Sequence, residues 1–396
     1  MSMNDTPSAQ RIHIGFFGCR NAGKSSLVNA VTGQALAIVS EVMGTTTDPV
    51  RKAMELLPLG PVVIIDTPGF DDEGDLGKAR VERTLEALEA CDAGVLVADA
   101  TRGLRPEDRQ LLALMKTRGM VPLLAWNKAD LPQALPAPEG ALAVSALTGM
   151  NIHALKEALA RTVPHRQARR LAGDLVPPGG LAVLVCPMDE SAPKGRIILP
   201  QQQVIRDLLD SGAQALVTRE TELPRALAAL KAPPDLVITD SQVFRQVDAV
   251  VPPSVPLTSF SILMARWKGF LAPAVAGVAA MERLRDGDRV LMAEGCTHHR
   301  QCNDIGTVKI PRWLREHTGR EIAIDTCTGR DFPRDLSPWA LVIHCGGCML
   351  TETVVQHRLA TALAQGVPFT NYGIAIARMT GILARSLAPL GESAQR

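Results

Sequence analysis

The chain has 396 residues, 46% of them hydrophobic and 3% aromatic, with a formal net charge of +1. This length predicts two or three domains, and the near-neutral charge gives no electrostatic case for nucleic acid or an anionic membrane as a partner. No apolar run reaches about 20 charge-free residues, the length that spans a bilayer. Residues 1–10 lack the apolar core of a signal peptide, and eight cysteines without one favour reduced thiols in the cytoplasm.

The first predicted strand, residues 12–17, leads into the pattern G-x-x-x-x-G-K-S and a helix over residues 26–32. In this context, backbone N–H groups and the helix N-terminus bind nucleotide phosphates. Lys24 is expected to bridge the β- and γ-phosphates, and Ser25 to bind Mg²⁺. The expected contacts with the nucleotide are Gly18, Arg20, Asn21, Ala22, Gly23, Lys24, Ser25 and Ser26.

The next predicted strand ends in a motif that suits GTP. Residues 62–65 run into Asp66, Thr67, Pro68 and Gly69, where Asp66 would hold Mg²⁺ through water and the Gly69 N–H would sense the γ-phosphate. This motif completes the predicted phosphate and magnesium site.

Guanine recognition is predicted further along the chain. A strand over residues 94–98 is followed by one over 121–126, which ends in Asn127, Lys128 and, after one residue, Asp130. Asp130 can accept the N1 and N2 hydrogens of guanine, which adenine does not present in that pattern. Ser145 and Ala146 then supply the loop whose backbone meets guanine O6.

These motifs, in this order, resemble those of the TRAFAC-class small GTPases. The segment GTTTD at residues 44–48 is similar to the switch loop of the Era and MnmE-like subgroup, and Asn21 matches the phosphate-loop Asn of that subgroup. The resemblance implies that Asn21 helps to bind a K⁺ ion in place of an arginine finger. The switch ligand of Mg²⁺ is one of Thr45, Thr46 and Thr47, and register favours Thr46. Phe70 stands where Ras-like enzymes carry a catalytic Gln, so slow, K⁺-stimulated hydrolysis is expected, with Lys24, Asn21 and Thr46 as the catalytic set.

A Pro/Gly-rich stretch at residues 174–180 predicts a domain boundary. The basic residues within 161–170 favour a solvated linker over an RNA-binding stripe, because no aromatic side chains are interleaved for base stacking. Strands over residues 181–186, 215–218 and 235–239 alternate with helices over 203–209 and 223–230. This small α/β unit carries no catalytic constellation, which is typical of an oligomerisation module.

A third α/β segment is predicted after residue 265. Its expected helices cover residues 274–284, 311–317 and 351–365, and its expected strands cover 289–293, 321–325 and 340–344. The predicted fold class is therefore α/β, with a P-loop GTPase domain followed by two smaller α/β domains.

Two cysteine segments directly follow predicted strands of this last segment. Cys296 follows the strand at 289–293, with His298 beside it, and Cys345 and Cys348 follow the strand at 340–344, next to His344. Because ligand sites gather beyond the carboxyl ends of strands, these side chains are expected at one edge. Three thiolates suit either zinc or an iron–sulfur cluster, and spacing alone favours both equally. Cys327 also ends a predicted strand and is a further candidate ligand.

An Era-like GTPase followed by C-x-H and H-C-G-G-C segments resembles the HydF family, the GTPase maturases of the FeFe-hydrogenases. The resemblance implies a homodimer with a GTPase domain (residues 1–173), a dimerisation domain (174–265) and an iron–sulfur domain (266–396). It also implies a 4Fe–4S cluster bound by Cys296, Cys345 and Cys348, with His298 as a proposed fourth ligand. Cys302 departs from the family pattern, so the fourth ligand stays open between His298, His344, Cys302 and an exchangeable ligand.

In that family the protein serves as scaffold or carrier for the two-iron precursor of the hydrogenase H-cluster. It receives this unit from radical-SAM maturases and delivers it to apo-hydrogenase. The competing interpretation is a ribosome- or tRNA-associated GTPase with a structural zinc site, which the charge and the lack of a recognisable RNA-binding module disfavour. A standalone redox enzyme is disfavoured by the complete GTPase motif set.

Overall fold

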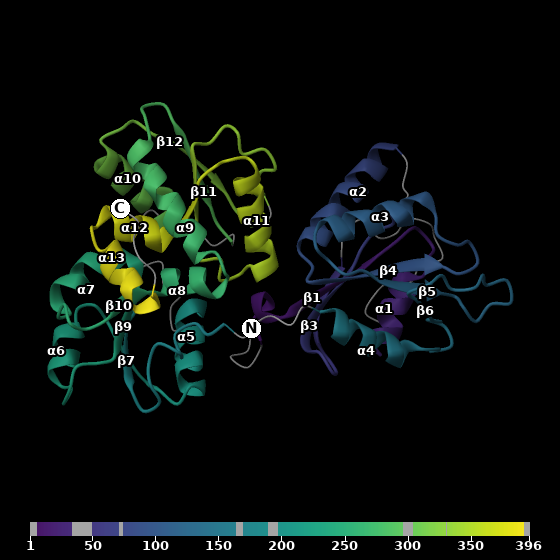
Figure 1. Cartoon of the computed structure of the whole chain (residues 1–396), viewed down its shortest axis with the longest axis horizontal. Helices are drawn as coiled ribbons and strands as arrows, with labels where there is room; N and C mark the ends of the chain where they lie inside the picture. Colours follow the sequence, from purple (N-terminus) through teal and green to yellow (C-terminus); the bar gives the residue numbers. More distant parts are fainter. Residues whose placement is uncertain are drawn as a thin grey trace. The chain divides into compact units, whose positions relative to one another are not determined.

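The computed structural model describes residues 6–33, 50–70, 74–163, 169–188, 197–295, 304–329 and 331–391. The chain forms two compact units, residues 1–167 and 168–396, drawn in purple to blue and in teal to yellow in Figure 1. Both are α/β, as predicted from the sequence.

The first unit contains a six-stranded sheet with the order β2-β3-β1-β4-β5-β6. All neighbouring strands are parallel except β2 and β3. The sequence missed β2 because most of its side chains are exposed or half-buried, which leaves no apolar run to detect. The strands are β1 (Ile12–Phe17), β2 (Val50–Leu56), β3 (Gly60–Asp66), β4 (Ala93–Asp99), β5 (Leu123–Asn127) and β6 (Ala141–Ala143).

Helices cover both faces of this sheet. Helices α1 (Lys24–Thr32) and α4 (Ile152–Thr162) pack on one face, and α2 (Gly74–Glu89) and α3 (Pro106–Thr117) on the other (Figure 1). Because β1 and β4 are buried on both faces, they read as continuous apolar runs. The carboxyl ends of β1, β3, β4 and β5 meet at one edge, which is where each predicted nucleotide motif begins.

The second unit contains two four-stranded parallel sheets with the orders β10-β9-β7-β8 and β12-β11-β13-β14. Read from opposite ends, these orders are the same, with β7 corresponding to β11. The strands are β7 (Leu181–Val185), β8 (Gln214–Thr218), β9 (Leu236–Thr239), β10 (Leu257–Ser259), β11 (Arg289–Ala293), β12 (Ala323–Cys327), β13 (Leu341–His344) and β14 (Phe369–Asn371).

The helices of this unit divide along the chain in the same way: α5 to α9 come from the first half and α10 to α13 from the second. The helix predicted over 274–284 is an α-helix only to residue 278 and continues as a 3-10 turn. The helices are α5 (Leu199–Asp210), α6 (Leu223–Ala228), α7 (Phe244–Val250), α8 (Phe260–Trp267), α9 (Leu271–Val278), α10 (Ile310–Thr318), α11 (Glu352–Ala364), α12 (Tyr372–Met379) and α13 (Leu383–Leu387).

The two halves also share sequence. Residues 255–272 read VPLTSFSILMARWKGFLA, and residues 367–384 read VPFTNYGIAIARMTGILA. Each segment forms a last strand, a capping residue and two helices: Ser259 accepts a hydrogen bond from the Ile262 N–H (3.3 Å), and Asn371 accepts one from the Gly373 N–H (2.8 Å). Shared topology and sequence identify the second unit as an internal duplication.

The duplicated halves exchange their last helices. Helix α9 of the first half packs on β14, and α13 of the second half packs on β10 (Figure 1). Thr370 donates to the Ala274 carbonyl oxygen (2.8 Å), and Arg385 binds the Asp248 carboxylate (2.6 Å). The halves therefore form one compact unit, and the boundary expected between residues 265 and 266 lies inside α8. The division into three domains stays a prediction.

Candidate functional site

The loop between β1 and α1 has the curled backbone that a phosphate site needs. Gly18 (φ 140°) and Gly23 (φ 88°) adopt conformations that L side chains avoid. A Cβ atom at Gly18 would lie 2.3 Å from the Val97 carbonyl oxygen, and one at Gly23 would lie 2.3 Å from the Asn127 side-chain nitrogen. Only glycine fits at either position.

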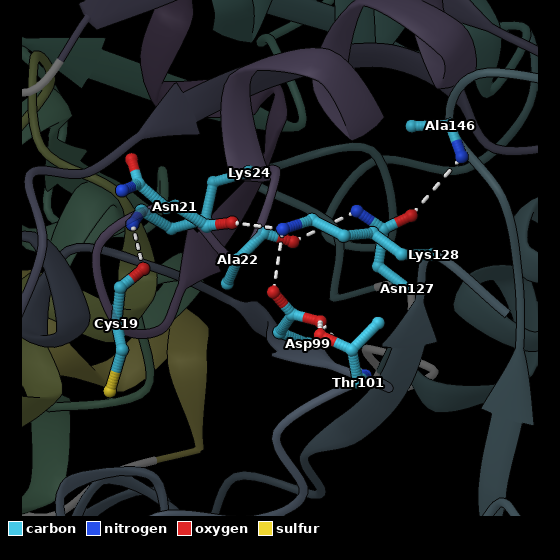
Figure 2. A network of polar contacts seen from close by, with 9 residues as sticks. All are labelled: Cys19, Asn21, Ala22, Lys24, Asp99, Thr101, Asn127, Lys128 and Ala146. Carbon is cyan, nitrogen blue, oxygen red and sulfur yellow. Dashed lines mark hydrogen bonds and ion pairs between the residues drawn. The ribbon is translucent and has the colours of Figure 1, made fainter. Parts of the chain in front are cut away.

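Lys24 is the first residue of α1, and its side chain folds back onto this loop. Its side chain is 8% exposed, and its ammonium donates to the carbonyl oxygens of Gly18 (3.0 Å) and Cys19 (2.8 Å), which Figure 2 shows in part. The loop thus holds the positive charge at the position predicted for the phosphates.

Ser25 and Asp66 form the hard-oxygen pair that Mg²⁺ prefers. The Ser25 hydroxyl donates to the Asp66 carboxylate at 2.6 Å. Burial raises the pKa of Asp66, while the Ser25 hydrogen bond and the charge of Lys24 oppose that rise. These two side chains fit the predicted magnesium site, whereas Thr46 lies outside the described residues.

Asn127 connects the phosphate loop with the loop predicted to meet guanine. Its amide nitrogen donates to the Ala22 carbonyl oxygen (2.8 Å), and its amide oxygen accepts from the Ala146 N–H (3.1 Å). Ser145 is buried and accepts from the Thr148 N–H (3.0 Å). Asp130 is exposed, three residues after Asn127. The structure therefore brings the predicted guanine residues to the same edge as the phosphate loop.

Asp99 belongs to this network but was not predicted. Lys128 donates to the Asn21 carbonyl oxygen (2.7 Å) and to Asp99 (2.5 Å), and Thr101 donates to the other Asp99 oxygen (Figure 2). Burial works to raise the pKa of Asp99, but the hydrogen bonds from Lys128 and Thr101 outweigh it, and the pKa is lowered. The missed signal was an acidic residue ending a buried strand at the nucleotide edge.

The cysteine loop lies at the carboxyl edge of the second sheet of the other unit. Ala293 of β11 is in register with both Cys327 of β12 and His344 of β13. The Cys345 sulfur accepts hydrogen bonds from the N–H groups of Gly295 (3.1 Å) and Gly347 (3.3 Å). Since Gly295 directly precedes Cys296, this contact joins the two predicted ligand segments.

His344 is fully occupied by protein partners. Its Nδ1 donates to the Cys345 carbonyl oxygen (2.6 Å), and its Nε2 accepts from Arg358 (3.0 Å). Burial, with the charge of Arg358, lowers its pKa to about 3, so the ring is neutral. Because both ring nitrogens form hydrogen bonds with the protein, neither is available to bind iron as the fourth cluster ligand.

Several other polar residues lie around this loop. Tyr372 donates to the Glu294 carboxylate (3.3 Å), and Asp304 accepts from the Gly306 and Thr307 N–H groups (3.0 and 2.9 Å). Glu294, Tyr372 and Asp304 are all buried.

The remaining thiols divide into three groups. Cys348 is half-buried and packs on the core that contains Met264, and Cys327 is buried, with its pKa raised to about 11 by burial. Cys19 donates to Asp108 (3.1 Å), while burial raises the pKa of Cys91 and that of Cys186, the latter to about 12. Cys296, His298 and Cys302 lie outside the described residues. Within the described ranges, no three metal-binding side chains are already grouped around one point.

Comparison with known proteins matches three segments of the chain to family models. Residues 13–128 match the family model of a 50S ribosome-binding GTPase, residues 171–269 the hydrogen maturase F dimerization domain, and residues 272–389 the hydrogen maturase F tetramerization domain. The tRNA modification GTPase MnmE of Methylorubrum populi is 36% identical over 163 residues, which are 40% of this chain and 34% of that protein. GTPase Der of Kosmotoga olearia is 36% identical over 125 residues, 30% of this chain and 28% of that protein.

The chain thus spans about a third of the length of the curated relatives that it matches. Among solved structures, Aquifex aeolicus Era bound to GDP and AlF4⁻ matches 55% of this chain and 98% of its own, at 19% identity and a TM-score of 0.36. No helix in the described part of the chain is long and apolar enough to cross a membrane.

The fold and the nucleotide site define a P-loop GTPase followed by a second α/β unit. Both halves of that second unit match hydrogen maturase F domains, one after the other. The chain belongs to the HydF family.

Replacing Asp99 by Asn should weaken GTP binding about tenfold, because Lys128 loses the charged partner that holds it against the phosphate loop. Titration with a fluorescent GTP analogue measures this. The control is Glu157→Gln, which alters an exposed carboxylate on α4 of the same unit. Parent-like affinity in Asp99→Asn would refute a role for this ion pair.

Proposed function

We propose that the chain is a GTP-hydrolysing scaffold that binds a 4Fe–4S cluster and carries the two-iron precursor of the FeFe-hydrogenase H-cluster to apo-hydrogenase. The observation that carries this proposal is the hydrogen-bonded Cys345 thiol, which ties the Cys345–Cys348 loop to the residue before Cys296 in a chain that also has a GTP site. Membership of the HydF family supports the same function.

The described residues fit an iron–sulfur cluster. Cys345 and Cys348 share a loop in which Gly347 (φ 65°) allows a tight turn, and backbone N–H groups already point at the Cys345 sulfur. Cys296, Cys345 and Cys348 would bind three irons, with His298, Cys302 or an exchangeable ligand on the fourth. Once bound, the cluster would supply an anchor for the two-iron unit and a one-electron centre.

The nucleotide site would act as the switch of this scaffold. Lys24 and the loop backbone would hold the phosphates, Ser25, Thr46 and Asp66 would serve Mg²⁺, and Asn21 would help to bind K⁺. Radical-SAM maturases would load the homodimer in the cytoplasm, and apo-hydrogenase would receive the cargo. The dimerization domain matched at residues 171–269 supports self-association.

The alternative, a ribosome- or tRNA-associated GTPase with structural zinc, is supported by the GTPase domain alone. The ribosome-binding GTPase family matches residues 13–128, and the segments after residue 170 match hydrogen maturase F. Metal and sulfide analysis of anaerobically purified protein separates the two: iron with sulfide supports the proposal, and zinc without sulfide contradicts it.

Lys24→Ala should slow GTP hydrolysis by at least about 100-fold, because a buried cation at the phosphates is lost. Phosphate release gives the rate, and iron content should stay at the parent level because the proposed cluster ligands lie in the other unit. Lys116→Ala, an exposed lysine on α3, is the control. Loss of iron in Lys24→Ala would contradict independent sites.

Exchanging Na⁺ for K⁺ should speed hydrolysis several-fold, because Asn21 lies in the predicted phosphate loop, in a left-handed conformation (φ 59°). Steady-state rates in matched chloride salts provide the measurement, and Asn21→Ala should remove the difference. Equal rates of the parent protein in both salts would remove K⁺ from the proposal.

Cys345→Ser should lose most of the cluster iron after anaerobic reconstitution, because it removes a thiolate bond at the centre of the loop. Cys186→Ser is a matched control: Cys186 follows β7, the strand that corresponds to β11 in the duplicated half. Iron per chain and the visible absorption band report the result. Equal iron loss in Cys327→Ser would add Cys327 to the ligand set, and full iron retention in Cys345→Ser would contradict the proposed site.

A further inference from the structure

Arg358 of α11 is a buried cation without a carboxylate partner. Its side chain is 2% exposed, and its guanidinium donates to the carbonyl oxygens of Glu294 and Gly329 and to Nε2 of His344. All three acceptors are neutral groups. Among the described residues, no Asp or Glu carboxylate forms an ion pair with it.

Other arginines of the same unit are paired, although they are more exposed. Arg266 binds Asp174, Arg378 binds Glu282 (2.9 Å) and Arg385 binds Asp248 (2.6 Å). A guanidinium removed from water without an opposite charge destabilises the folded protein. The burial of Arg358 therefore calls for an anion close by.

Two thiols lie close enough to this cation to supply the missing negative charge when they are ionised or bound to a metal. Burial lowers the pKa of Arg358, and Cys327 and Cys345 are the two groups whose negative charge would oppose that shift. Arg358 also reaches the cysteine loop through hydrogen bonds, since it donates to His344, and His344 donates to the Cys345 carbonyl oxygen. Two successive hydrogen bonds thus connect the positive charge to the cysteine loop.

We propose that Arg358 is the fixed counter-charge of an anionic iron–sulfur site at Cys345, and that it raises the reduction potential of that site. This inference rests on the proposed function. A cluster bound by thiolates is negatively charged and gains a further negative charge when a one-electron donor reduces it. A buried positive charge stabilises the reduced form more than the oxidised form, most strongly where the local dielectric is low.

Arg358→Gln and Arg358→Lys separate the charge from the hydrogen bonds. Both variants, reconstituted anaerobically with ferrous iron and sulfide, are titrated with dithionite and redox mediators while electron paramagnetic resonance reports the reduced cluster. The midpoint potential should shift to more negative values in Arg358→Gln and stay close to the parent value in Arg358→Lys. Arg378→Gln, which removes a paired arginine from α12, is the matched control and should leave the potential unchanged.

An unchanged potential in Arg358→Gln with iron retained would overturn the inference, as would an equal shift in the Lys and Gln variants. Should Arg358→Gln take up no iron, Arg358→Lys decides: parent-like iron and potential support a required charge, and iron loss in both variants overturns it. A parent protein that binds no iron and sulfide would contradict the proposed function itself.

Discussion

The hydrogen bonds from the Gly295 and Gly347 backbone to the Cys345 sulfur are the contacts on which the cysteine site depends. They require β11 and β13 to be adjacent and parallel, so that both strands end at the same level. They also require glycine: a Cβ atom at Gly295 would lie 2.9 Å from the Leu350 side chain. A buried thiol is a poor ligand unless it can become a thiolate, and donated N–H groups favour that form.

The internal duplication gives this site its surroundings. Helix α8 of the first half faces the cysteine loop of the second half: a Cβ atom at Gly346 would lie 3.5 Å from Met264, and Lys268 donates to the Leu350 carbonyl oxygen (2.5 Å). Because α9 and α13 are exchanged between the halves, each sheet is completed by helices from the other. The edge with Cys345 and Cys348 is thereby enclosed by both copies, although the cysteine pair lies in one.

The nucleotide site follows a related principle with different chemistry. Strand ends of a parallel sheet again converge, here with a curled glycine loop whose carbonyl groups hold Lys24. Asn127 and Lys128 both reach back to that loop, so the predicted guanine-binding segment and phosphate segment are mechanically connected. These two hydrogen bonds are 2.8 and 2.7 Å long.

The sequence by itself determined the α/β class, the order of most strands, the nucleotide motifs and the position of the cysteine pair. These features are encoded locally, in apolar runs and in spacings such as G-x-x-x-x-G-K-S and C-x-x-C. Only the tertiary structure decided that His344 bonds to Arg358 and Cys345, that Asp99 supports Lys128, and that the second unit is two interlocked halves. Those contacts join residues from distant segments, because a buried contact is set by packing across the sheet edge. Of these facts, only the duplication leaves a trace in the chain, as the repeat at residues 255–272 and 367–384.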